Sequence, residues 1–328
     1  MKVLIVGGTG LISTPITTLL LEQGHTITHF NRGNKKEDFP DVQTIVGDRT
    51  DFVAFEFLLE HKTFDCVIDM VCYKPEEAKS AIETFEGNTQ HFILCSTVDV
   101  YTKPAPHYPV AEDVPRQPSK EFTYAYNKAK CEEIFLEAHE QNNFPVTIIR
   151  PAYTYREGYG ILHTFGWSTD YLERIRLGKP IITHGDGNSF WVACHAEDVA
   201  RAFVNTMGNS STVGKSYHVT GEEWLTWRAY HETVAKALGC DLPEIIHIPT
   251  DVLYKLVPEQ SFWAKVNFQY NNLFDNTLAK QDLDFRHTVT WLQGAKRMVD
   301  WLDANKRIEG SSPDHYENVI QLWRKAGF

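Results

Sequence analysis

A tyrosine and a lysine stand four residues apart at Tyr124 and Lys128, a spacing that places both on one face of a helix. A phenol with a pKa of about 10 is a poor base at neutral pH, and an adjacent ammonium stabilises the phenolate and lowers that pKa. Thr97 follows an apolar run and offers a hydroxyl that would hydrogen-bond a substrate oxygen. Together these side chains predict movement of a proton as a hydride is transferred.

A second tyrosine–lysine pair, Tyr126 with Lys130, overlaps the first. Its helical face continues into Glu133, a pattern typical of a solvated stripe. The face of Tyr124 continues instead to the apolar Phe135, which indicates packing against the rest of the protein. We therefore predict that the pair beginning at Tyr124 is the functional one.

A glycine-rich turn follows the first apolar strand. Its small residues Gly7 and Gly10 are followed by Leu11 and Ile12, and then by a helical pattern in which Ser13 takes the place of a third glycine. Such a strand–turn–helix binds a dinucleotide, because the glycines let the backbone approach the pyrophosphate and the helix N-terminus faces its charge. We predict contacts from these residues to the cofactor.

The end of the second strand indicates which dinucleotide is preferred. NAD-binding versions place an acidic residue about 20 residues after the glycines, to hold the adenosine ribose. Here Asn31 and Arg32 stand at that point, with Lys35 and Lys36 nearby. Because a guanidinium can pair with a 2′-phosphate, NADP(H) is favoured over NAD(H); the structural alternative is that these cations form a solvated loop.

Asp48 and Arg49 follow the third strand. The carboxyl ends of parallel strands line the ligand crevice of such sheets, so both residues are candidates for the adenosine end of the cofactor. We expect Asp48 near the adenine amino group. Capping of the next helix by Asp48 is the structural alternative.

The elements that must position these residues alternate along the first half of the chain. Apolar strands are separated by helix-length amphipathic stretches, which predicts an α/β fold with a doubly wound parallel sheet of the Rossmann type. We expect residues 1–150 to form the dinucleotide-binding domain and 151–328 a smaller substrate-binding domain, with part of 190–220 returning to the sheet. The expected strands are 2–6, 26–30, 43–46, 66–71, 91–95 and 146–149; the expected helices are 15–23, 51–61, 75–85, 125–142, one from Thr226 to Gly239, and 316–325 after a break at 311–313.

Composition and charge limit the kinds of partner and the cellular compartment that we expect. The 328 residues carry a net charge of −11, which argues against nucleic acid as the main partner. The six cysteines are scattered without a Cys-x-x-Cys pair, so neither a zinc site nor a disulfide scaffold is expected, and a reducing compartment, the cytoplasm, is favoured. No apolar run reaches the length needed to span a membrane, and no metal-ligand spacing is present.

These motifs together resemble the extended short-chain dehydrogenases/reductases, specifically the NAD-dependent epimerase/dehydratase family, over nearly the whole chain. The resemblance implies that Thr97 binds the substrate oxygen, that Tyr124 is the acid/base, and that Lys128 tunes Tyr124 and holds the nicotinamide ribose. It also implies that Pro151 and Tyr153 lie where the backbone contacts the carboxamide. The motifs that carry it are Gly7-Gly8-Thr9-Gly10-Leu11-Ile12, Ser96-Thr97, Tyr124 to Lys128 with Glu132, Arg150-Pro151, Gly185-Asp186-Gly187, His195 with Asp198-Val199-Ala200, and Val219-Thr220-Gly221.

Departures from the family pattern concern the substrate. Trp191 stands where the resemblance implies an arginine for the diphosphate of a nucleotide sugar; an indole cannot pair with a diphosphate but can stack on a ring. Arg156 or Arg174 could supply the missing charge. Asp99 lies where the dehydratases carry a proton-abstracting glutamate, so it is a candidate second acid/base or a local turn residue. His163 and Trp167 are the remaining substrate candidates.

The sequence thus predicts an NAD(P)-dependent oxidoreductase or epimerase. It would act by hydride transfer on a hydroxyl or keto group of a sugar, nucleotide sugar or similar small molecule. The alternative is a non-catalytic dinucleotide-binding or RNA-associated protein of the same fold, because chloroplast stem-loop RNA-binding proteins also resemble this chain. A homodimer is possible, and no membrane partner is expected.

Overall fold

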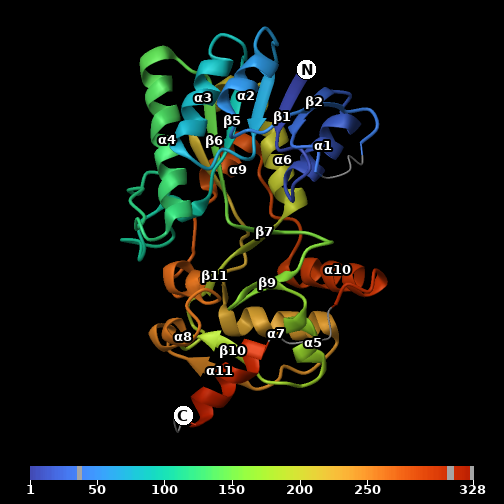
Figure 1. Ribbon diagram of the computed structural model, residues 1–328, viewed down its shortest axis with the longest axis vertical. Coiled ribbons are helices and arrows are strands. Elements are labelled where there is room, and N and C mark those ends of the chain that lie inside the picture. Colours follow the sequence, from blue (N-terminus) through green and yellow to red (C-terminus); the bar gives the residue numbers. More distant parts are fainter. Residues whose placement is uncertain (35–38, 309–313, 326–328) are drawn as a thin grey trace.

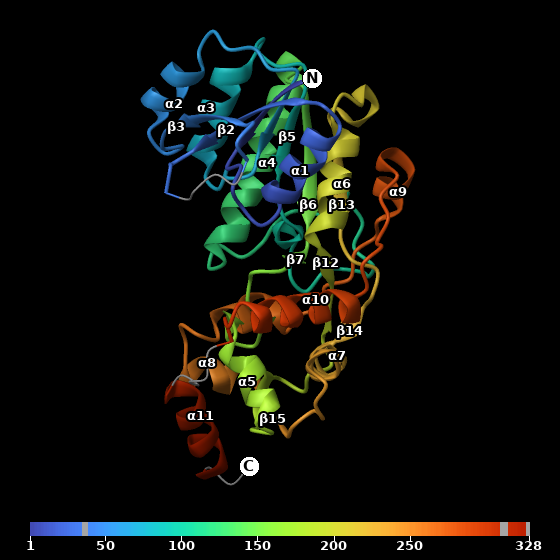
Figure 2. The same cartoon turned by 90° about the vertical axis from the view of Figure 1, so that its right-hand side faces the viewer.

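The computed structural model describes residues 1–34, 39–308 and 314–325. The molecule is elongated, with a sheet-containing part at one end and the C-terminal helix at the other (Figure 1). The connection between the two parts includes β7 (Tyr153–Tyr155) and β12 (Ala193–His195), which run side by side (Figure 2). Two sequence features, Lys35-Lys36 and the expected break at 311–313, lie outside the described residues.

The larger part is built on a seven-stranded sheet in which every pair of neighbours is parallel, so the predicted fold class is confirmed. The strand order is β13-β6-β5-β4-β1-β2-β3 and reverses direction between β1 and β4. In such sheets ligands bind at that reversal, beyond the carboxyl ends of the strands. The strands are β1 Lys2–Val6, β2 Thr26–Asn31, β3 Gln43–Val46, β4 Cys66–Asp69, β5 Phe92–Cys95, β6 Val146–Pro151 and β13 Ser216–Val219.

Helices cover both faces of this sheet, and alternation along each strand sends successive side chains to opposite faces. Val3 and Ile5 of β1 pack into one apolar cluster, and Leu4 and Val6 pack into the other. The first face is covered by α1 (Ser13–Glu22), α6 (Ala196–Thr206) and α9 (Thr277–Leu283); the second is covered by α2 (Phe52–Leu59), α3 (Pro75–Phe85) and α4 (Thr123–Asn142).

The sheet therefore recruits chain from beyond residue 150. Both α6 and β13 come from the segment 190–220, and α9 comes from later still. The smaller part has an aromatic core that includes Tyr155, Trp191, Trp227 and Trp291. Its other elements are β8 Ile161–His163, β9 Gly166–Ser168, α5 Asp170–Arg176, β10 Ile181–His184, β11 Phe190–Trp191, β14 Leu225–Thr226, α7 Trp227–Leu238, β15 Ile245–Ile248, α8 Thr250–Leu256, α10 Trp291–Ala304 and α11 Asp314–Lys325.

Some element ends differ from the expectation for local reasons. The strand expected over 66–71 stops at Asp69, whose Oδ1 accepts a hydrogen bond from the amide of Val71 and turns the chain. The helix expected over 51–61 spans only Phe52–Leu59, with Asp51 as its N-cap. The helix after Thr226 is confirmed: the threonine hydroxyl accepts from the amide of Ala229. Within the described residues, no helix is long and apolar enough to cross a membrane.

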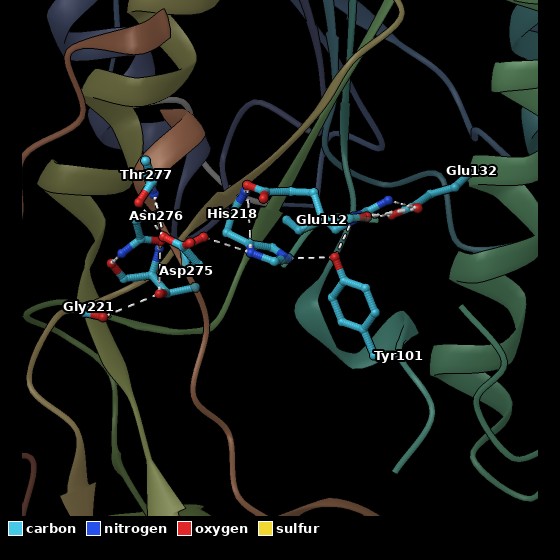
Figure 3. A network of polar contacts seen from close by, with 10 residues as sticks. Tyr101, Glu112, Glu132, His218, Gly221, Asp275, Asn276 and Thr277 are labelled. Atoms are coloured by element: carbon cyan, nitrogen blue, oxygen red, sulfur yellow. Dashed lines mark hydrogen bonds and ion pairs between the residues drawn. The ribbon is translucent and has the colours of Figure 1, made fainter. Parts of the chain in front are cut away.

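A buried polar network runs from Glu132 of α4 to Tyr101 and His218, the latter on β13 (Figure 3). The Glu132 carboxylate accepts from Arg150 Nη2 at 2.7 Å and from Ser96 Oγ at 2.5 Å. Arg150 Nη1 also donates to the Tyr101 hydroxyl at 2.5 Å, which lies 2.5 Å from His218 Nε2. Arg150 and Glu132 are almost fully buried, so Arg150 needs Glu132 as its counter-ion; Glu132 also pairs with the partly exposed Arg116.

We expect Glu132→Gln to destabilise the fold by about 3–5 kcal/mol, because it leaves the Arg150 guanidinium buried without its counter-ion. The neighbouring Glu133 is half-exposed and pairs with Lys130 on the surface, so Glu133→Gln should cost at most about 1 kcal/mol. Urea unfolding of both variants measures the difference. Equal stability of the two variants would show that the buried pair does not brace the fold.

Four buried histidines predict acid sensitivity. Burial lowers the pKa of His91 and His184 to about 4 and that of His218 and His231 to about 3. Between pH 6.5 and 4 the unfolded chain therefore binds protons that the folded chain does not, so stability falls as the pH falls. Unfolding free energies measured from pH 7.5 down to 4.5 should decline steadily, with a shallower slope in His91→Asn. A flat profile contradicts the prediction.

Candidate functional site

Three adjoining cavities run from the glycine turn to the smaller part of the molecule. We call them the glycine-turn cavity, the junction cavity and the aromatic cavity; their volumes are about 380, 420 and 380 Å³. Tyr73 lines all three, and Thr97 and Tyr124 line the last two. The cavities therefore form one groove across the carboxyl edge of the sheet.

The glycine-turn cavity contains the residues expected at the adenosine and pyrophosphate end. Gly7 has a φ of +87°, and a Cβ there would lie 2.6 Å from Val71 Cγ1, so this position requires glycine. The Asn31 Oδ1 atom accepts from the amide of Gly8 at 2.8 Å and braces the turn. The lining residues include Gly7, Gly10, Asn31, Arg32, Asp48 and Arg49.

Asp48 and Arg49 differ in how they are held. Asp48 Oδ1 accepts from the amide and the hydroxyl of Thr50, and these bonds lower the pKa of the carboxyl. The alternative in which Asp48 caps the next helix is wrong, because Asp51 does so. Arg49 is buried, with its guanidinium 4.1 Å from the centre of the Phe55 ring, and its Nε and Nη1 have no hydrogen-bond partner. The Nη2 atom of Arg49 donates to the backbone carbonyl of Glu77 and lies 3.5 Å from Asp69 Oδ2, so the guanidinium is fixed from within the protein.

The junction cavity brings together the expected reactive residues. Thr97, Tyr124, Lys128 and Pro151 line it, and its other end is formed by the turn residues Gly10, Leu11 and Ile12. The Lys128 ammonium donates to the backbone carbonyls of Cys72 at 2.8 Å and Cys95 at 2.6 Å. Those carbonyls lie just beyond β4 and at the end of β5, so the lysine ties α4 to the carboxyl edge of the sheet.

The pKa of Tyr124 differs from the sequence expectation. Burial raises it above the ordinary value, and the nearby Lys128 charge opposes that rise without cancelling it. The expected attraction between Lys128 and the Tyr124 phenolate is therefore present, but the expected net lowering of the Tyr124 pKa is wrong for this arrangement. At neutral pH the Tyr124 phenol carries its proton and can donate it to a neighbouring oxygen.

The competing tyrosine lies elsewhere. Tyr126 lines none of the three cavities, and its ring is approached by the ammonium groups of Lys120 and Lys130 at 5.9 and 5.8 Å from its centre. Lys130 pairs with Glu133 on the exposed face of α4. The structure thus places Tyr124 in the groove and Tyr126 on the outer side, as the pattern of apolar residues indicated.

The aromatic cavity holds most of the expected substrate residues. Asp99, Tyr153, Trp167 and Trp191 line it, so Tyr153 lies toward the substrate end of the groove. His163 is the exception. It is buried outside the three cavities, with its ring stacked on Tyr171 at a centroid distance of 4.8 Å and its Nε2 2.7 Å from Ser168 Oγ. Its place is in the core of the smaller part.

Several groove residues were missed from the sequence. Tyr73 follows β4 at the carboxyl edge of the sheet, a position that could have singled it out. The sequence carries no motif or periodicity that identifies three further residues, which come from an irregular segment around a π-helical turn: Trp263, Asn267 and Asn272. Lys103 lies behind Asp99 and donates to Asp99 Oδ1 at 3.2 Å and to Asn272 Oδ1 at 2.7 Å.

Neither arginine suggested as a diphosphate ligand lies in the groove. Arg174 is buried against Tyr316, with its centre 4.1 Å from that ring, and pairs with Glu317 of α11. Arg156 lies beside Tyr159 and lines none of the three cavities. Within the described ranges, no group of three or more His, Cys, Asp or Glu side chains could hold a metal ion.

Known proteins with similar sequences differ in function. The chain is 29% identical to the chloroplast stem-loop binding protein of 41 kDa b of Arabidopsis thaliana, over 94% of this chain and 77% of that protein. It is 23% identical to a UDP-N-acetyl-alpha-D-glucosaminuronate decarboxylase of Bacillus cytotoxicus, over 92% of this chain and 97% of that protein.

Solved structures and a family model agree on the fold. A dTDP-glucose 4,6-dehydratase of Bacillus anthracis in complex with NAD superposes with a TM-score of 0.76 at 18% identity, covering 93% of this chain and 97% of that one. A UDP-glucose 4-epimerase of Thermotoga maritima with UDP-glucose also superposes with a TM-score of 0.76. Its sequence identity is 17%, and the superposition covers 93% of this chain and 100% of that one. The model of the NAD dependent epimerase/dehydratase family matches residues 3–220, and this protein is a member of that family.

Proposed function

We propose that this protein is an NAD(P)-dependent oxidoreductase or epimerase that transfers a hydride to or from a hydroxyl or keto carbon of a sugar or similar small molecule. The observation that carries the proposal is the position of Thr97, Tyr124 and Lys128 in the junction cavity. One side of this cavity adjoins the glycine turn, and the other adjoins a pocket lined by aromatic residues. A carbon held there would face both a proton donor and a dinucleotide.

The groove fits the cofactor at three points. The turn from Gly7 to Ile12 precedes the N-terminus of α1, where a pyrophosphate is stabilised. Asp48 and Arg49 would meet the adenosine end, and Lys128 with Pro151 would meet the nicotinamide end. When bound, the nicotinamide accepts or supplies the hydride.

The protein's own residues would manage the proton. The Thr97 hydroxyl, which accepts from the amide of Asp99 at 3.2 Å, would orient the substrate oxygen. Tyr124, with a raised pKa, would donate its proton to that oxygen during reduction and take it back during oxidation. The Lys128 charge would stabilise the phenolate formed in between.

NADP(H) remains the proposed preference. Arg32 lines the glycine-turn cavity, and Asn31 stands at the end of β2 where NAD-specific sites place an acid. Against this preference, the solved dehydratase that shares the fold is in complex with NAD. The free cysteines of the described residues support our proposal of a reducing compartment, the cytoplasm.

RNA association is the second candidate, and it is favoured by the similarity to the chloroplast stem-loop binding protein. A net charge of −11 argues against it, because phosphate binding needs clustered cations. A gel-shift assay with a stem-loop RNA at low salt separates the two functions. Tight RNA binding without cofactor binding would favour this second candidate.

The tyrosine assignment predicts a selective loss of activity. Tyr124→Phe should lower kcat by about 10²–10⁴-fold, because the proton donor is removed, while the affinity for NADPH stays within about twofold. Tyr126→Phe is the matched control and should retain full activity. Formation of reduced cofactor from a panel of sugars and polyols measures both. Activity lost in Tyr126→Phe and kept in Tyr124→Phe would reverse the assignment.

The NADP(H) preference predicts a second selective effect. Arg32→Ala should weaken NADPH binding by about tenfold or more, because a charge-assisted contact to the 2′-phosphate is lost, and should leave NADH binding unchanged. Arg286→Ala, at an exposed arginine outside the groove, controls for the general loss of positive charge. Fluorescence titration with both cofactors provides the measurement. Wild-type preference for NADH would refute the role of Arg32.

A further inference from the structure

The described lining of the aromatic cavity contains no lysine, arginine or histidine. Trp191 stands where the resemblance implied an arginine, and its indole Nε1 is buried without a hydrogen-bond partner. A nucleotide-sugar diphosphate entering this cavity would find no cation in its lining, because the Lys103 ammonium behind Asp99 is already paired with that carboxylate. The cavity is therefore unsuited to a charged substrate.

One wall of the cavity is polar and built from both parts of the molecule. Asp99 Oδ1 accepts from Asn267 Nδ2 at 2.9 Å and from Lys103 Nζ at 3.2 Å. Lys103 lies behind this wall, where it lines a separate cavity of about 130 Å³, and its charge is shared by Asp99, Asn267 and Asn272. The wall therefore presents one neutralised carboxylate and two amides to the groove.

Other surfaces of the cavity are flat and apolar. The rings of Trp167 and Trp263 meet nearly at right angles, at 84° and 6.0 Å between centres, and form a corner. Trp263 also lies 6.1 Å from the Tyr124 ring, so a ring packed on this indole lies beside the candidate proton donor. Trp167 is half-exposed at the edge of the groove, where an entering molecule would contact it.

We propose that the aromatic cavity binds an uncharged sugar that carries no phosphate or diphosphate. This inference rests on the proposed function and names its substrate class. The C–H face of the sugar ring packs on Trp263 and Trp167, since flat apolar indole surfaces suit such faces. The hydroxyl edge of the ring donates to Asp99 and bonds the amides of Asn267 and Asn272. The cavity volume of about 380 Å³ leaves room for a monosaccharide or a simple glycoside.

Saturation-transfer NMR on the full-length protein with NADPH tests this proposal. The probes are D-glucose, D-galactose, D-mannose, D-xylose and their methyl glycosides, measured beside UDP-glucose and UDP. We expect at least one neutral sugar to receive saturation at its ring C–H protons and to bind at least tenfold more tightly to the aromatic cavity than UDP-glucose. Trp167→Ala should reduce its affinity at least tenfold, and Trp224→Ala, at a tryptophan similarly exposed but outside the groove, should not change it.

Asp99→Asn should weaken the binding of the same sugar several-fold, because an amide oxygen is a poorer acceptor for a hydroxyl than a carboxylate oxygen. Tighter binding of UDP-glucose than of every neutral sugar, no saturation of any neutral sugar, or equal effects of the two tryptophan variants would each overturn the substrate class. Reduction of the cofactor by UDP-glucose alone would leave the proposed function standing while refuting this inference. Sugar binding that depends on Trp167 without any cofactor reduction would support this inference and refute the proposed function.

Discussion

The buried ion pair between Glu132 and Arg150 is the constraint on which the groove depends. Neither side chain has water to stabilise its charge, so α4 and β6 are held at a defined distance and rotation. Ser96 joins the pair and ties in the end of β5. Because Tyr124, Lys128 and Glu132 are spaced by four residues on α4, anchoring the glutamate turns the other two side chains toward the carboxyl edge of the sheet.

The same geometry explains how Lys128 is held. Its ammonium is buried between two carbonyls that end neighbouring strands, and these acceptors keep it positioned even though burial opposes its charge. Lys128 in turn moderates the effect of burial on Tyr124. The Tyr124 phenol is thereby held next to a fixed positive charge, the arrangement on which the proposed proton transfer rests.

The smaller part of the molecule supplies much of the cavity wall beside the Tyr124 phenol. Its aromatic core extends into the groove through Trp191 and Trp263, and its irregular segment contributes Asn267 to the polar wall of the aromatic cavity. The bonds from Asn267 to Asp99 and Lys103 cross between the two parts and link the wall to the sheet. The family fold is retained here, whereas the described lining of the aromatic cavity combines aromatic rings with two amides and a carboxylate that pairs with Lys103.

The sequence by itself determined the parallel sheet, the glycine turn and the placement of Tyr124, not Tyr126, on the inner face of α4. These features depend on local periodicity and on spacings of a few residues, and therefore not on contacts between segments that are distant in the sequence. Only the tertiary structure decided the walls of the aromatic cavity, since Asp99 and Asn267 lie 168 positions apart. It also decided the burial of His163 and the direction of the Tyr124 pKa, because both depend on how completely distant segments exclude water from a side chain.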